Sequence, residues 1–157
     1  NNTRLLDIGA YPGGWSQVSS KIITVGKILS LDIKKMDKLK NVSFLQCDFL
    51  AESTKEKILK FFRGKLDVVL SDMAANTTGN KSLDCIRTNQ LCSDVIEFSS
   101  KILKPNGVLV SKLFMGEDFL EVKDLAKSRF KKVQFFKPEA SRNESKETYL
   151  HCSILKT

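Results

Sequence analysis

Short apolar runs recur along the chain, and stretches with a helical period separate most of them. The runs that predict buried strands lie at residues 4–8, 27–31, 42–46, 66–71 and 107–113. The helical stretches lie at residues 14–24, 53–62, 84–103 and 118–128. This alternation is typical of a doubly wound α/β sheet with parallel strands. Residues 33–41 are too few and too charged for a crossover helix, so we expect a loop there.

Two further extended stretches close the chain, at residues 132–137 and 147–155. Only the polar segment PEASRNESK joins them, which leaves no room for a helix, so we expect these two strands to pair antiparallel. The motif KPNG at residues 104–107 is expected to stop the preceding helix and turn the chain into the next strand. With 157 residues and 41% hydrophobic content, we expect residues 1–157 to form one domain.

Glycines gather where the first predicted strand ends, in the segment DIGAYPGGW at residues 7–15. Glycine permits positive φ and a close approach to a ligand, and a helix that begins at Gly14 would aim its free N–H groups into this turn. Tight turns also recruit glycine for backbone reasons alone, so the turn is a weak signal by itself. The spacing of Gly9, Gly13 and Gly14 departs from the G-x-G-x-x-G of dinucleotide sites and is a form met in S-adenosylmethionine sites.

Aspartates end the next two predicted strands. Asp32 lies 18 residues after Gly14, where doubly wound folds place a carboxylate that accepts hydrogen bonds from ribose hydroxyls. Asp48 ends the third strand, where it could accept a hydrogen bond from an adenine amino group. Each aspartate alone could equally be a helix cap or a turn residue. Combined with the glycine turn, the two predict a nucleotide-type cofactor site.

The segments LDIGAYPGGWSQV, LSDMAANTTG, LVSKLFMG and KPEASRNESKETYL together resemble the FtsJ/RrmJ (RlmE) family of ribosomal RNA 2′-O-methyltransferases. The likeness extends in order over nearly the whole chain. It implies a Rossmann-like class I S-adenosylmethionine-dependent methyltransferase fold, with a mostly parallel sheet and an antiparallel C-terminal strand. It also implies methylation of a uridine ribose in large-subunit ribosomal RNA, with S-adenosylmethionine as the cofactor.

The resemblance also implies roles for individual residues. The family's S-adenosylmethionine-binding positions correspond to Gly13, Trp15, Asp32, Asp48 and Asp72, and the glycine turn adds Gly9 and Gly14. The family's catalytic tetrad is Lys-Asp-Lys-Glu, and its last three members resemble Asp72, Lys112 and Glu147. The first lysine of the tetrad belongs to an N-terminal helix that precedes the glycine loop in the family. This sequence begins after that point, so we expect that helix to be lacking here.

Lys112 ends a predicted strand, at the carboxyl edge where such sheets bind ligands. A ribose hydroxyl is a weak acid, so methyl transfer to it needs a base or an electrostatic stabiliser near the oxygen. Lys112 could serve as proton acceptor or as a cation that steers the hydroxyl, and the sequence leaves both open. Asp72 and Glu147 would orient Lys112 through charge-assisted hydrogen bonds.

The chain has a formal charge of +8, which favours a polyanionic partner such as ribosomal RNA within the large subunit. One candidate surface for phosphate contacts is the basic segment with Lys127, Arg129, Lys131, Lys132, Lys137, Arg142 and Lys146. A second lysine cluster, near the expected adenosine side, comprises Lys34, Lys35, Lys38 and Lys40. Solvated charged faces are the alternative interpretation of both groups.

The four cysteines form no C-x-x-C pair, and His151 is the single histidine, so the sequence spells out neither a zinc site nor a disulfide framework. No apolar run approaches the length of a membrane span. We therefore expect a cytoplasmic monomer that binds neither metal nor membrane. Other functions remain open: a 2′-O-methyltransferase of transfer RNA or the messenger RNA cap, and a catalytically silent module that binds S-adenosylmethionine or RNA. The glycine spacing disfavours a nicotinamide oxidoreductase.

Overall fold

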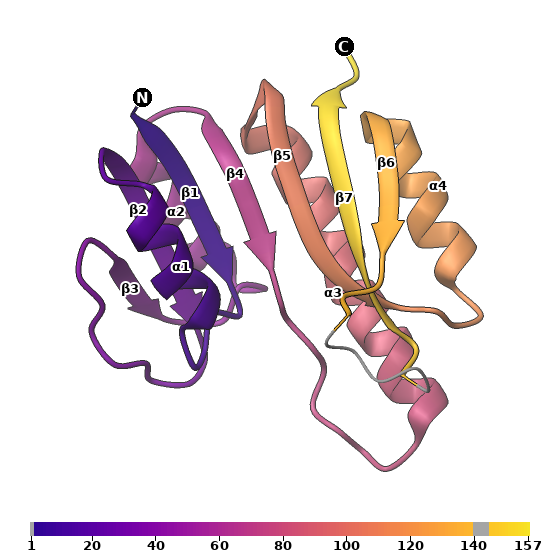
Figure 1. Ribbon diagram of the computed structural model, residues 1–157. Coiled ribbons are helices and arrows are strands. Elements are labelled where there is room, and N and C mark those ends of the chain that lie inside the picture. The colour runs from indigo at the N-terminus through magenta and orange to yellow at the C-terminus, as the bar shows by residue number, and fades with distance from the viewer. Residues whose placement is uncertain (1, 140–144) are drawn as a thin grey trace.

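The computed structural model describes residues 2–139 and 145–157, and its strands form one sheet in the order β3-β2-β1-β4-β5-β7-β6 (Figure 1). The strands are β1 (Thr3–Ile8), β2 (Gly26–Asp32), β3 (Ser43–Gln46), β4 (Leu66–Ser71), β5 (Leu103–Phe114), β6 (Phe130–Phe136) and β7 (Glu147–Leu155). The helices are α1 (Gly14–Ile22), α2 (Glu52–Phe62), α3 (Lys81–Ile102) and α4 (Phe119–Arg129). The strands and helices predicted from the apolar pattern are therefore confirmed, apart from differences at their ends.

Strands β1 to β5 pair in parallel, whereas β7 is antiparallel to both of its neighbours, β5 and β6. The expected α/β fold, with a mostly parallel sheet and an antiparallel C-terminal strand, is confirmed. Residues 140–144 of the segment between β6 and β7, which include Arg142, lie outside the described residues. The loop at residues 33–41 contains no helix, as its length and charge predicted.

Apolar and polar side chains alternate along β1 and β2, and this alternation shows which helices cover which face of the sheet. Leu6 and Ile8 belong to the apolar core that α2, α3 and α4 help to form. Asp7, which lies between them, faces the other way and accepts a hydrogen bond from Ser16 of α1. Ser30 of β2 also contacts Ser16. Helices α2, α3 and α4 therefore pack on one face, and α1 packs on the other (Figure 1).

Helix α3 begins three residues before the expected range of 84–103. Asn80 caps it, because its side chain accepts a hydrogen bond from the backbone N–H of Leu83. This cap explains the earlier start, since it satisfies one of the free N–H groups in the first turn.

Strand β5 begins at Leu103, whereas the expected strand began at residue 107. Leu66 of β4 pairs with Leu103, and the next paired residues are Val68 and Val108. The KPNG motif therefore forms a bulge in the strand and does not separate the helix from the strand by a turn. Pairing with β4 on both sides of the motif keeps the chain extended.

The carboxyl ends of the parallel strands meet at one edge of the sheet, and α1 begins at that edge. None of the helices in residues 2–139 and 145–157 is long and apolar enough to cross a membrane.

Candidate active site

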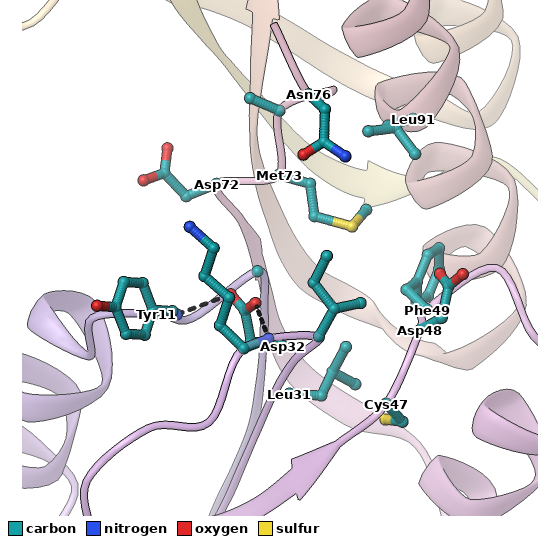
Figure 2. Close-up of a pocket in the computed structure, with 14 residues that line it drawn as sticks. Tyr11, Leu31, Asp32, Cys47, Asp48, Phe49, Asp72, Met73, Asn76 and Leu91 are labelled. Carbon is teal, nitrogen blue, oxygen red and sulfur yellow. Dashed lines mark hydrogen bonds between the residues drawn. The ribbon is translucent and has the colours of Figure 1, made fainter.

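A cavity of about 320 Å³, the first cavity, opens where β1, β2, β3 and β4 end (Figure 2). Its lining mixes the carboxylates of Asp32, Asp48 and Asp72 with apolar side chains such as those of Phe49 and Met73. Asp48 and Asp72 lie on opposite sides of the cavity in Figure 2. This volume and this mixture of polar and apolar groups are typical of small-molecule sites.

Gly9 allows the turn after β1 to lie against the segment after β4. Its φ is +71°, and an added Cβ would lie 2.7 Å from Cγ and 3.0 Å from the backbone nitrogen of Met73. The backbone N–H of Asp72 also donates to the carbonyl of Ile8, at 3.1 Å. Only glycine combines this dihedral angle with this contact, so the glycine has a structural role at the mouth of the first cavity.

Asp32 organises the backbone around the first cavity. Its carboxylate accepts hydrogen bonds from the backbone N–H groups of Tyr11 and Lys34, each at 2.9 Å (Figure 2). Asp48 accepts a similar bond from the N–H of Leu50, at 3.0 Å. The turn interpretation and the ligand interpretation of these aspartates are therefore compatible, because both residues bond the backbone and also line the cavity.

A second group of charged side chains, the Lys112 cluster, comprises Lys112 of β5, Asp72 after β4 and Glu147 of β7. The Lys112 amine lies 3.1 Å from Oδ1 of Asp72 and 3.3 Å from Oε2 of Glu147. The Lys112 side chain is only 14% exposed. The structure thus brings together the three residues that the sequence resemblance implied as catalytic, and two ion pairs hold Lys112 between the two carboxylates.

Tyr149 is a further member of this site that the sequence analysis missed. Its hydroxyl donates to Oδ1 of Asp72 at 2.9 Å and lies 3.4 Å from Oε1 of Glu147. Burial and the two nearby carboxylates raise the pKa of Tyr149, so the phenol remains a neutral donor. The signal was present, since Tyr149 follows Glu147 by two positions on one strand and must share its face of the sheet.

Asp72 joins the two parts of the site, because it lines the first cavity and also contacts Lys112. Of the residues predicted to bind the cofactor, Gly9, Asp32, Asp48 and Asp72 line this cavity. The other three, Gly13, Gly14 and Trp15, lie outside its lining, at the start of α1.

Gly13 precedes α1 with a φ of 113°. The Trp15 ring lies 5.5 Å from the Tyr149 ring, measured between centroids. The start of α1 therefore lies beside Tyr149 and the Lys112 cluster. The residues predicted to bind the cofactor thus fall into two adjoining groups, one that lines the first cavity and one at the start of α1.

Beneath the glycine turn, Asp7 is fully buried. Ser16 donates to its Oδ2 at 2.5 Å, whereas its Oδ1 has no hydrogen-bond partner among the described residues. Burial raises the pKa of Asp7 to about 6, and the negative charges of Asp72 and Asp32 act in the same direction. Among the described residues, Asp7 is thus a buried acid without a cation in an ion pair with it.

One of the two basic surfaces contributes a residue to the lining of the first cavity, and the described residues of the other do not. In the lysine cluster at residues 34–40, the Lys34 amine lies 5.2 Å above the Tyr11 ring, and both residues line the first cavity. In the basic segment, Lys146 directly precedes Glu147, whereas Arg129 is paired with Glu97 at 3.0 Å. Among residues 2–139 and 145–157, no group of three or more His, Cys, Asp or Glu side chains could hold a metal ion.

Comparison with known proteins gives a family and a fold. The model of the FtsJ-like methyltransferase family matches residues 1–154. Ribosomal RNA large subunit methyltransferase E of Rickettsia akari is 46% identical over 155 residues, which are 95% of this chain and 68% of the relative.

Two solved structures share the fold. A protein of Plasmodium falciparum, described as a ribosomal RNA methyltransferase, superposes with a TM-score of 0.86 at 28% identity, over 99% of this chain and 88% of that one. Human Methyltransferase-like protein 13, solved in complex with SAH, superposes with a TM-score of 0.72 at 16% identity, over 98% of this chain and 72% of that one. These neighbours confirm the expected Rossmann-like methyltransferase fold.

Proposed function

Since the chain belongs to the FtsJ-like methyltransferase family, we propose that it transfers a methyl group from S-adenosylmethionine to a ribose 2′-hydroxyl of ribosomal RNA. The name of the Rickettsia akari relative supports large-subunit RNA as the substrate, and the family resemblance supports uridine as the acceptor. One observation carries the proposal: Asp72 belongs to both the first cavity and the Lys112 cluster, so a cofactor and an acceptor hydroxyl can meet there.

The first cavity suits S-adenosylmethionine, which supplies an electrophilic methyl group on a sulfonium when bound. Asp32 uses its carboxylate for two backbone bonds, and a carboxylate offers about four lone-pair sites, so it can also accept from ribose hydroxyls. Asp48, on the side of the cavity away from Asp72, would accept from the adenine amino group. Gly13, Gly14 and Trp15 would then hold the amino-acid end near Lys112.

Lys112 is the proposed proton acceptor. The lone pair of its neutral amine would take the hydroxyl proton as the ribose oxygen bonds to the methyl carbon, and the electron pair of the carbon–sulfur bond would leave with sulfur. Asp72 and Glu147, at 3.1 and 3.3 Å, stabilise the ammonium that results. They also fix the position of Lys112, and such positioning supplies much of the rate of a displacement that requires three atoms in line.

Mass spectrometry of methylated RNA tests this function. The full-length protein is incubated with methyl-labelled S-adenosylmethionine and with large-subunit RNA, free or in ribosomal particles, and the RNA is digested to nucleosides. We expect the label in 2′-O-methyluridine.

Other outcomes contradict separate parts of the proposal. If transfer RNA or a messenger RNA cap is offered in parallel and gains the label instead, the assignment of ribosomal RNA as the substrate is wrong. A label on a base would exclude the ribose assignment, and cofactor binding without any transfer would indicate a silent binding module. In calorimetry, tight binding of NAD and none of S-adenosylmethionine would overturn the cofactor assignment.

A further inference from the structure

A second cavity, of about 430 Å³, lies between the start of α3, the end of β5 and the segment that leads into β7. Cys85 and Ile86 line it from α3, Phe114 and Gly116 from the end of β5, and Lys146 from the segment before β7. It shares no lining residue with the first cavity. The proposed roles of the cofactor residues therefore leave this cavity unused.

The second cavity adjoins the Lys112 cluster on the side away from the first cavity. Phe114 follows Lys112 by two positions on β5, which corresponds to about 7 Å along a strand. Phe114 also pairs directly with Glu147 across the sheet. The N–H of Met115 donates to the carbonyl of Lys146 at 2.8 Å. This pairing holds the cavity wall in a fixed position relative to the cluster.

The lining of the second cavity has the chemistry that a nucleotide requires. Phe114, Ile86 and Cys85 offer apolar and aromatic surface for the flat face of a base. Lys81 and Lys146 approach from different segments of the chain and carry the positive charge that phosphates need, while Asp84 and Glu117 add two carboxylates to the same lining.

From this placement we propose that the second cavity receives the base of the acceptor nucleotide, the nucleotide whose ribose is methylated. The inference rests on the proposed 2′-O transfer. In a nucleotide only the C2′ and C1′ carbons separate the 2′-oxygen from the base. A base in the second cavity therefore leaves its 2′-oxygen beside Lys112, and Asp72 marks the side from which the methyl group arrives.

Gly116 offers a way to fill the second cavity without straining the backbone. An added Cβ would lie 3.6 Å from Oδ1 of Asp118 and 3.7 Å from Cβ of Cys85, which are ordinary contacts. A leucine at this position therefore extends into the cavity that the base would occupy. Ser53→Leu is a matched control, since it adds a leucine at an exposed position near the start of α2, away from the basic segment.

The test compares two RNA substrates that differ only at the acceptor nucleotide. One carries the intact nucleotide, and the other carries an abasic ribonucleotide that keeps its 2′-hydroxyl. Loss of base stacking predicts that the wild-type protein prefers the intact substrate in kcat/KM by about tenfold or more. In Gly116→Leu we expect this preference to fall to within about twofold, while its S-adenosylmethionine affinity stays unchanged. Ser53→Leu should keep the wild-type preference.

The outcomes separate this inference from the proposed function. If the wild-type protein methylates the 2′-oxygen of both substrates equally, the base is not recognised and the inference is wrong. If Gly116→Leu keeps the wild-type preference, the base binds elsewhere and the inference is again wrong. If neither substrate gains a 2′-O-methyl group while the native RNA is methylated at another atom, the proposed function itself fails.

Discussion

The proposed cofactor half of the site, which is the first cavity with the start of α1, and the Lys112 half, which is the Lys112 cluster with Tyr149, hold their carboxylates in different ways. Around the first cavity, Asp32 and Asp48 bond backbone N–H groups: those of Lys34 and Leu50, two residues further on, and that of Tyr11 in the turn after β1. In the Lys112 cluster, side chains from β5, β7 and the end of β4 bond one another. Among the described residues, Asp7 beneath the glycine turn is buried without an ion-pair partner, whereas Asp72 is paired with Lys112. Bonds from carboxylates to the backbone thus shape one half, and ion pairs between side chains shape the other.

The largest effect is expected from Lys112→Ala, which should lower kcat by about 10²–10⁴-fold, since it removes the acid–base group at the reacting oxygen. S-adenosylmethionine affinity should stay within about twofold of wild type, because Lys112 does not line the first cavity. Single-turnover methylation and calorimetry measure the two quantities. Equal losses in kcat and in S-adenosylmethionine affinity would mean that Lys112 also contributes to cofactor binding.

Two further lysine variants serve as controls for that result. Lys104 lies at the other end of β5 and is paired with Asp67 at 2.7 Å, so Lys104→Ala removes an ion pair of the same strand away from the site. We expect its kcat to match the wild type. Lys112→Arg keeps the charge but cannot accept a proton, so near-wild-type activity of this variant would show that Lys112 acts as a steering cation.

The next effect concerns Asp7 and the dependence of the free energy of unfolding on pH. The folded chain raises the pKa of Asp7 from 3.8 to about 6, so folding favours the neutral acid. The stabilisation that the folded chain gains from neutral Asp7 is fully present below pH 3.8 and is lost as the pH rises through about 6. Relative to Asp7→Asn, which does not titrate, wild-type unfolding free energy should fall by about 3 kcal/mol across this range. Urea denaturation of both proteins at several pH values measures the difference, and a constant difference would contradict the assignment.

A smaller effect is expected from Gly9→Ala, which tests the backbone geometry of the cofactor half. The added methyl meets Met73 at 2.7 Å and must accept positive φ, so the free energy of unfolding should fall by about 2–3 kcal/mol. Gly14→Ala is the matched control, because an added Cβ there meets no heavy atom of the described residues within 4 Å. Thermal denaturation should rank the control at or above wild type. Equal stability of the two variants would refute the close contact.

The smallest effect is expected from Tyr149→Phe, which removes the hydroxyl bonded to Asp72 but keeps the ring between Trp15 and Phe136. Loss of one hydrogen bond to a charged group predicts a fall in kcat of about 10-fold. The KM for S-adenosylmethionine should not change, because Tyr149 does not line the first cavity. A change in KM alone would place Tyr149 in the cofactor half.

Much of the fold and part of the site could be predicted from the sequence because the signals are local. Apolar periodicity located the strands, and the glycine turn and the strand-end aspartates pointed to residues that line the first cavity, Gly9, Asp32 and Asp48. By contrast, Asp72, Lys112 and Glu147 lie far apart in the chain, and only the family resemblance brought them together before the structure did. The position of Tyr149 two residues after Glu147 was a local signal for a shared face, but its bond to Asp72 also depends on the pairing of β7 with β5. The bulge at residues 104–107 also depends on a neighbouring strand, β4.

The contact between Gly9 and Met73 leaves no space for even one added carbon atom. The close approach of the segments that follow β1 and β4 therefore requires glycine at position 9, because an added carbon would meet the main chain of Met73 at 3.0–3.1 Å as well as its Cγ at 2.7 Å. Substitutions elsewhere in the lining can alter which molecule binds while the framework keeps its dimensions. Protein engineers who wish to change the cofactor preference should vary Ile33, Phe49 or Leu91 and leave this main-chain contact intact.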